Sequence, residues 1–254
     1  MSFPWKGFLE EAGAISRFTG RFFVESFRPN YEVREFFRQC FFIGYKSVGL
    51  VCITAFIMGL VLTMQSRPTL AEFGAEAWLP KMVSVSLVRE IVPVITALIC
   101  AGKIGSGIGA ELGSMRVTDQ IDAMEVSGTN PYKYLVSTRV YATTLMVPLL
   151  VVLGSAVSLY GGYLGATMYG GIHWKLYWSQ VFDTLSYSDV LPALVKTFFF
   201  GFAIGMVGSY KGYNSPKGTE GVGLSANSAV VLASLIVFIL DLLAVQVTQV
   251  LRLN

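Results

Sequence analysis

VYATTLMVPLLVVLGSAVSLYGGYLGATMYGGIHW, residues 140–174, is a run of 35 residues without one charged side chain. About 20 apolar residues are enough for a helix to cross the hydrocarbon core of a membrane. At about 1.5 Å per residue, a helix of the whole run would exceed one hydrocarbon thickness. The run therefore predicts a membrane span over about residues 140–165 and an extension above the membrane, with Gly161 and Gly162 near the join.

Four further stretches have the length and apolar character of a span. They cover about residues 47–66, 82–102, 190–210 and 224–250. The first contains no charge, and the others contain four charged residues in total: Arg89, Glu90, Lys196 and Asp241. The fold class that this pattern predicts is an all-α membrane protein, with a five-span domain over residues 46–254.

The composition of the chain supports a membrane protein. Of its 254 residues, 54% are hydrophobic and 14% are charged, against about 25% charged in soluble domains. The net charge of +3 gives no reason to expect a nucleic-acid partner. The three cysteines lack metal-binding spacing and His173 is the single histidine, so we predict neither a metal site nor catalytic residues.

Lysine and arginine are distributed unequally between the two sides of the membrane. With the N-terminus in the cytoplasm, the inside segments carry Lys6, Arg17, Arg21, Arg28, Arg34, Arg38, Lys46, Lys103, Arg116, Lys133, Arg139, Lys211 and Lys217. The outside segments carry only Arg67, Lys81, Lys175 and Arg252. Because cytoplasmic loops are enriched in basic residues, this asymmetry predicts the N-terminus inside and the C-terminus outside.

Residues 1–45 are too charged to span a membrane. Apolar residues nevertheless recur there at helical spacing, namely Trp5, Phe8, Leu9, Ala12, Ile15, Phe18 and Phe22. Arginines and glutamates fall between them, which is typical of an amphipathic helix lying in the membrane interface. The alternative is a soluble N-terminal helix hairpin, which would leave these aromatic side chains without a core.

The loop between spans two and three is unusually long and patterned. It begins with Gly105, Gly109 and Gly113, whose spacing of four places them on one helix face and permits close helix packing. Polar and apolar residues then alternate, which predicts a cytoplasmic amphipathic helix over about residues 108–126 that ends at Ser127-Gly128. Asn130-Pro131 suits the start of the next helix. An ordinary solvated loop is the alternative to a docking surface for a cytoplasmic partner.

SLVREIVPVITALICAGKIGSGIGAELGSMRVTDQIDAMEVSGTNP, residues 86–131, closely resembles the signature region of the MlaE family of ABC transporter permeases. The resemblance continues more weakly through the last two spans, including GYNSPKGTEGVG at 212–223. It implies a permease that moves phospholipids or related lipids between the inner and outer membranes. The expected location is then the bacterial inner membrane, with the C-terminus in the periplasm.

The resemblance also implies partners. The family's coupling helix docks in a groove of an ABC ATPase, a role that falls here on Glu111, Gly113, Arg116, Asp119 and Asp122. Relatives often have Glu at position 119, and Asp keeps the charge. The expected assembly is a homodimer of this chain with two ATPases and a periplasmic MCE-domain protein. No GxxxxGK[ST] occurs in this chain, so ATP and Mg are expected in the ATPase and no cofactor here.

The charges within the spans form a second candidate site. Counted from the predicted span ends, Arg89, Glu90, Lys196 and Asp241 all lie about 9–15 Å below the outer boundary. Because an intramembrane charge costs at least about 2.5–3.5 kcal/mol, we expect pairing across helices, as Glu90–Lys196 and Arg89–Asp241. Such pairs could gate a lipid cavity or only fix the helices, and the sequence favours neither.

The predicted function is thus that of a lipid permease subunit with an apolar cavity at its homodimer interface. Candidates to line that cavity are Leu60, Met64, Leu232 and Ile236. An ion-coupled secondary transporter, with Glu90 or Asp241 carrying protons, is the main alternative, although the sequence shows no internal repeat. An intramembrane enzyme is a weaker alternative because no HExxH or GxSxG occurs. A purely structural scaffold is the third.

Overall fold

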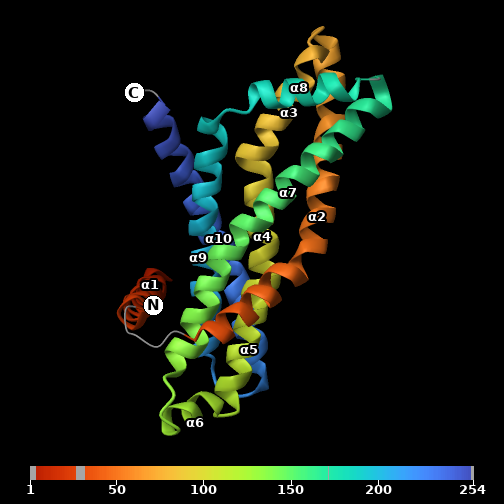
Figure 1. Cartoon of the computed structure of the whole chain (residues 1–254). Coiled ribbons are helices and arrows are strands. Elements are labelled where there is room, and N and C mark those ends of the chain that lie inside the picture. The colour runs from red at the N-terminus through yellow and green to blue at the C-terminus, as the bar shows by residue number, and fades with distance from the viewer. Residues whose placement is uncertain (1–3, 27–31, 171, 253–254) are drawn as a thin grey trace. The chain divides into compact units, whose positions relative to one another are not determined.

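The computed structural model describes residues 4–26, 32–170 and 172–252, and these residues form helices joined by short loops (Figure 1). Short 3₁₀ (η1) and π-helical (η2, η3, η4) turns interrupt or extend the α-helices. In chain order the elements are α1 (Pro4–Ser26), α2 (Val33–Glu72), η1 (Glu76–Trp78), α3 (Leu79–Ser86), η2 (Leu87–Ile91), α4 (Val92–Cys100), η3 (Ala101–Gly105), α5 (Ser106–Val117), α6 (Gln120–Val126), η4 (Tyr132–Ser137), α7 (Thr138–Gly170), α8 (Trp174–Thr184), α9 (Tyr187–Tyr213) and α10 (Thr219–Arg252).

Within the part of the chain that the structure describes, five helical stretches are long and apolar enough to cross a membrane. They are Val33–Glu72, Glu76–Val117, Tyr132–Met168, Tyr187–Tyr213 and Thr219–Leu251. Each contains one of the five spans expected from the sequence, with additional helical turns at its ends. The prediction of an all-α membrane protein is confirmed.

Two predicted boundaries differ from the helices observed. Helix α2 begins at Val33, so residues 33–45 are the first turns of the same helix as span one and do not belong to a separate N-terminal segment. Helix α7 continues without interruption through Gly161 and Gly162 to Gly170. No join lies at these glycines, because they serve instead in close helix contact, as described below.

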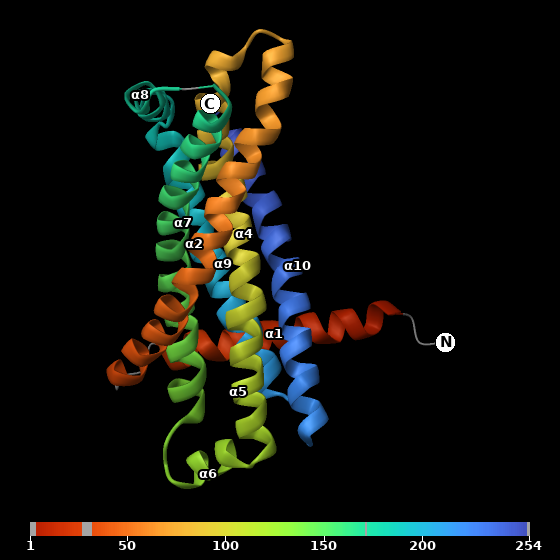
Figure 2. The ribbon, with the colours of Figure 1, turned by 90° about the vertical axis from the view of Figure 1, so that its right-hand side faces the viewer.

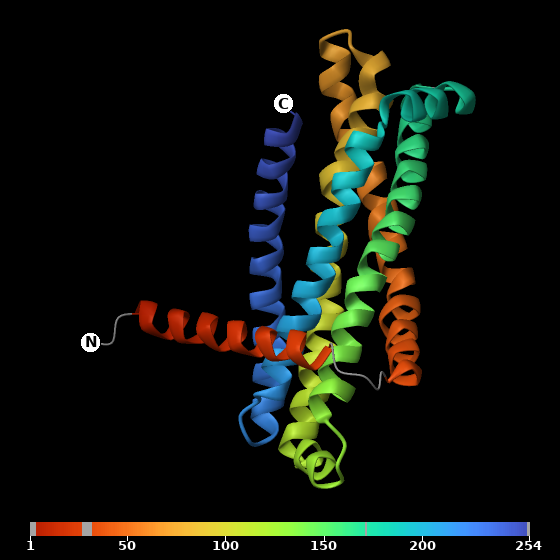
Figure 3. The ribbon, with the colours of Figure 1, turned by 60° about the vertical axis from the view of Figure 1, so that its left-hand side comes forward.

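The chain divides into two compact units, which are described separately. Unit 1 comprises Met1–Ile43, Cys100–Leu145 and Gly201–Ile236, and unit 2 comprises Gly44–Ile99, Met146–Phe200 and Val237–Asn254. Within unit 1, α1 runs across the direction of α5 and of the unit's other long helices (Figures 2 and 3). This orientation is the one that an interfacial helix needs, although the interface itself stays a prediction.

The core of unit 1 is aromatic and joins α1 to η4. Its buried members are Phe22, Tyr132, Val136, Val140 and Met206. Phe18 packs against them, and its carbonyl oxygen accepts a hydrogen bond from the hydroxyl of Tyr132. Part of the apolar face predicted for α1 therefore contacts protein. The side chains of Trp5, Phe8 and Leu9, like residues 1–3, 27–31 and 253–254, lie outside those that the structure describes.

Glycines bring the helices of unit 1 into backbone contact. A β-carbon at Gly109 would lie 3.2 Å from the carbonyl oxygen of Ser225 in α10, and one at Gly201 would lie 2.5 Å from that of Thr143 in α7. One at Gly208 would lie 3.0 Å from the carbonyl oxygen of Gly105. The close packing predicted for the glycines of the loop is confirmed at Gly109, which joins α5 to α10.

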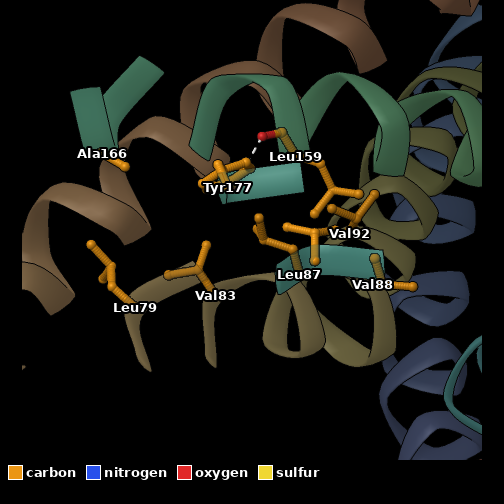
Figure 4. Close-up of a cluster of buried hydrophobic side chains, with 9 residues drawn as sticks. Leu79, Val83, Leu87, Val88, Val92, Leu159, Ala166 and Tyr177 are labelled. Carbon is orange, nitrogen blue, oxygen red and sulfur yellow. Dashed lines mark hydrogen bonds between the residues drawn. The ribbon is translucent and has the colours of Figure 1, made fainter. Parts of the chain in front are cut away.

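The core of unit 2 is formed by α3, η2, the start of α4, α7 and α8 (Figure 4). Its buried residues are Leu79, Val83, Leu87, Val88, Val92, Leu159, Ala166, Tyr177 and Val181. The hydroxyl of Tyr177 donates a hydrogen bond to the carbonyl oxygen of Leu159 at 3.1 Å. Burial raises the pKa of the Tyr177 phenol, so it remains a neutral donor. Helix α8 is thereby fastened to α7.

Helices α2 and α7 of unit 2 touch through their backbones. A β-carbon at Gly161 would lie 2.3 Å from the carbonyl oxygen of Phe56, and one at Gly59 would lie 1.9 Å from that of Ser158. Only a residue without a side chain fits at either position. The two glycines therefore fix where α2 and α7 meet.

Candidate functional site

Residues 106–126 of unit 1, the coupling segment, consist of two helices rather than one. Helix α5 ends at Val117 and α6 begins at Gln120. Between them Asp119 has a left-handed backbone with φ of 55°. Non-glycine residues occupy this region rarely, and Asp does so more readily than most. The single helix predicted over 108–126 is therefore wrong, because the chain turns at Thr118–Asp119.

The turn brings together two of the charged side chains assigned to coupling. Nη1 of Arg116 lies 2.5 Å from Oδ1 of Asp122, across the junction between α5 and α6. Both side chains are partly exposed, at 36% and 54%. Asp119 is exposed at the turn itself. Three of the five residues assigned to ATPase coupling thus lie together on an accessible surface.

The other two residues assigned to coupling point elsewhere. Gly113 is buried, and a β-carbon there would lie 3.4 Å from the Ser215 hydroxyl and 3.5 Å from the Cα of Val222. The carboxylate of Glu111 pairs with Arg139 of α7 at 2.8 Å. Gly113 therefore serves helix packing, and Glu111 connects the coupling segment to α7.

The coupling segment ends at a loop that α1 contacts. The Asn130 side-chain oxygen accepts the backbone N–H of Tyr132 at 3.1 Å, so Asn130 caps the helix that follows, as predicted. Its amide nitrogen donates to Glu25 of α1 at 3.0 Å. The guanidinium of Arg21 lies 4.7 Å from the centre of the Tyr132 ring. These contacts connect α1 to the loop after α6.

Val126 is a member of this surface that the sequence reading did not single out. It ends α6 and is 91% exposed. The sequence feature that could have indicated this role is the position of Val126 at the end of an amphipathic helix. An exposed apolar side chain one helical turn after Asp122 suits a contact with another protein better than contact with water.

Three of the four charged residues predicted within the spans, Glu90, Lys196 and Asp241, form a cluster around Lys196 in unit 2. The ammonium of Lys196 lies 2.5 Å from Oε2 of Glu90 and 2.8 Å from Oδ1 of Asp241. The Lys196 side chain is only 6% exposed, whereas that of Glu90 is 44% exposed. Three different helical elements, η2, α9 and α10, thus meet at one ammonium group. The predicted pair Glu90–Lys196 is confirmed.

The second predicted pair, Arg89–Asp241, is wrong. Asp241 bonds Lys196 instead, and Nε of Arg89 lies 3.8 Å from Oδ1 of Asp189, in the first turn of α9. Arg89 and Glu90 belong to the π-helical turn η2. Asp189 was missed because it lies just outside the predicted span, although its position seven residues before Lys196 places both on one helix face.

A groove of about 740 Å³ opens beside this cluster between α9 and α10. Most of its lining is apolar, with Leu191, Val195, Phe199, Leu240, Leu243, Val247 and Leu251. Polar groups reach it from Lys196, Ser188 and Thr248. Leu60, Met64, Leu232 and Ile236 are not among its lining residues, so their place in a lipid pocket stays a prediction.

Comparison with known proteins matches residues 36–247 to the family model described as permease MlaE. A probable ABC transporter permease protein of Rickettsia felis is 38% identical over 232 residues, which cover 91% of this chain and 90% of the relative. A probable ABC transporter permease of Synechocystis is 35% identical, covering 87% and 84%. The intermembrane phospholipid transport system permease protein MlaE of Haemophilus influenzae is 32% identical over 205 residues, covering 80% and 78%.

Proposed function

The chain belongs to the MlaE permease family and is a multi-pass membrane permease of an ABC-type transporter, and from this premise we propose that it moves phospholipids or related lipids between the inner and outer membranes. The family match over residues 36–247 is the observation that carries the proposal. The printed name of the Haemophilus influenzae relative supplies the phospholipid. The proposed location is the bacterial inner membrane, with the N-terminus in the cytoplasm and the C-terminus in the periplasm.

The groove between α9 and α10 has the chemistry that an amphiphile requires. Its apolar lining suits acyl chains. Lys196, Ser188 and Thr248 offer polar groups that would contact a headgroup. Lys196 already contacts two carboxylates, so the cluster as a whole, rather than a bare ammonium, would face the headgroup.

The proposed assembly is a homodimer with the lipid cavity at its interface. Helix α10 supports this assembly because only 17% of its most apolar stretch is buried, compared with 56% for α9. Leu242, Leu243 and Val247 of α10 are more than half exposed. A second copy of the chain would cover this apolar surface, although lipid tails are equally apolar neighbours.

ATP hydrolysis is assigned to a separate ABC ATPase that docks on the coupling segment. Arg116, Asp119, Asp122 and Val126 support this assignment, because they place charged and apolar exposed groups on the end of α5, the turn that follows it and α6. The ATPase would bind ATP and Mg, and this chain would hold no cofactor. A periplasmic MCE-domain protein completes the proposed system.

The ion-coupled alternative has less support. It required Glu90 or Asp241 to carry protons, and both carboxylates contact the same lysine. The ABC permease names of the relatives also favour transport driven by ATP.

The decisive experiment is purification of the chain from its native membrane with its bound partners, and reconstitution into vesicles. Mass spectrometry should identify an ABC ATPase and phospholipid in the purified complex. Transfer of labelled phospholipid should require ATP and should continue after a proton gradient is collapsed. Transport that needs the gradient and no ATPase would support the ion-coupled alternative instead.

A further inference from the structure

Arg139 is a buried cation that the transport proposal has not used. It is the second residue of α7, and its side chain is 1% exposed. Nη1 donates to the carbonyl oxygen of Leu135 at 2.9 Å, and Nη2 lies 2.8 Å from Oε1 of Glu111. Nε is buried and has no hydrogen-bond partner among the described residues. Glu111 is therefore the counter-charge that the structure gives this guanidinium.

Glu111 belongs to the coupling segment, two residues before Gly113 on α5. Its side chain is 48% exposed while one oxygen contacts Arg139. The backbone of Glu111 thus lies in the accessible segment that we propose contacts the ATPase, and its carboxylate contacts the fully buried guanidinium of Arg139 in α7. Both helices belong to unit 1.

Stability alone is a poor explanation for this pair. Apolar side chains of similar volume often stabilise a buried contact as well as an ion pair does, since each buried charge loses its hydration. An ion pair does differ in one respect: its partners must keep a short distance and a fixed direction. If the carboxylate moves, the guanidinium therefore has to move with it or lose the ion pair.

The backbone that Arg139 contacts is also unusual. Leu135 lies in η4, a π-helical turn that continues directly into α7. Side chains of the first turn of α7 bond two carbonyl oxygens of η4, because Thr138 donates to Tyr134 at 2.6 Å and Arg139 donates to Leu135. π-helical turns are rare and often occur at functional sites. Such a turn can exchange its hydrogen-bond register for that of an α-helix.

We propose that the Glu111–Arg139 ion pair is the link through which movement of the coupling segment reaches α7, with the π-helical turn η4 as the element that changes. Both are positioning residues: neither touches lipid or nucleotide. The inference rests on the proposed function, because the movement is supplied by the docked ATPase. It also reassigns Glu111 from a docking contact to an internal link.

The test compares Glu111→Gln, which removes the charge, with Glu111→Asp, which keeps it. Glu11→Gln is the matched control, because Glu11 pairs with Lys211 in the same unit and its side chain is 40% exposed. The first measurement is hydrogen exchange of residues 132–137 in the detergent-solubilised chain. The second is the lipid moved per ATP hydrolysed by the reconstituted complex, together with the ATPase bound per permease.

For Glu111→Gln we expect faster exchange in η4 and a ratio of lipid to ATP reduced by about fivefold or more, with the bound ATPase unchanged. Glu111→Asp should retain most of the ratio, and Glu11→Gln should leave it at the wild-type value. Loss of bound ATPase in Glu111→Gln would make Glu111 a docking contact and overturn the link. Unchanged exchange in η4 would overturn it as well. A wild-type complex that moved no lipid would refute the proposed function, and the exchange result would still decide the link.

Discussion

Replacing Lys196 by Met removes the ammonium that holds two carboxylates together. The Met side chain has similar length, so the change is chiefly electrostatic. Glu90 and Asp241 both lie within 2.8 Å of Nζ, so after the substitution they face each other at close range. Two like charges about 5 Å apart repel by about 3 kcal/mol at an effective dielectric constant of 20.

Loss of one partner from a buried pair costs about 3–5 kcal/mol in measured systems. Glu90 is 44% exposed, so water screens part of the repulsion and the expected loss is near the lower end of that range. The free energy of unfolding in mixed micelles and the amount of protein in the membrane should both fall. Lys175→Met, which alters an exposed lysine of α8, is the matched control and should change neither.

Compensating substitutions make the prediction sharper. Adding Glu90→Gln to Lys196→Met should restore only part of the lost stability. The recovery is incomplete because Asp241 still lacks its cation. Adding Asp241→Asn as well should restore most of it, because neutral partners need no counter-charge. If Lys196→Met matched the lysine control, or if the triple variant were no more stable than the single one, the electrostatic account of the cluster would be refuted. Recovered abundance without recovered transport would place the cluster in the lipid path.

Three further outcomes are expected. A reporter fused at Asn254 should be periplasmic and one inserted at Asn130 cytoplasmic, and a cytoplasmic C-terminus would contradict the predicted topology. Arg116→Glu should abolish ATPase binding or lipid transport while membrane abundance stays normal, and full transport with full assembly would exclude the docking surface. Gly161→Val should lower the free energy of unfolding by about 1–3 kcal/mol through overpacking against α2. Gly49→Val, at a glycine where an added β-carbon would meet no other atom within 4 Å, should have little effect on stability, and equal losses would disprove the backbone contact.

The amino-acid sequence by itself determined the membrane class and the number of apolar helices. A run such as residues 140–165 has no charged side chain and is long enough to cross the hydrocarbon core, so it predicts a membrane span. It also determined that the charges within the spans would be paired, since an isolated charge is too costly there. Sign and depth gave the correct pair Glu90–Lys196 but also the wrong pair Arg89–Asp241.

The tertiary structure decided which of these charged residues form ion pairs with one another. Depth along a helix can be counted from the sequence, but rotation about the helix axis depends on all of its neighbours. Asp241 therefore forms an ion pair with Lys196 rather than with Arg89. Arg89 pairs with Asp189, which lies outside the predicted span. The turn at Asp119 and the burial of Arg139 against Glu111 likewise depend on how the helices pack. Periodicity gives the face of a single helix, whereas a side chain finds its partner only when several helices have packed.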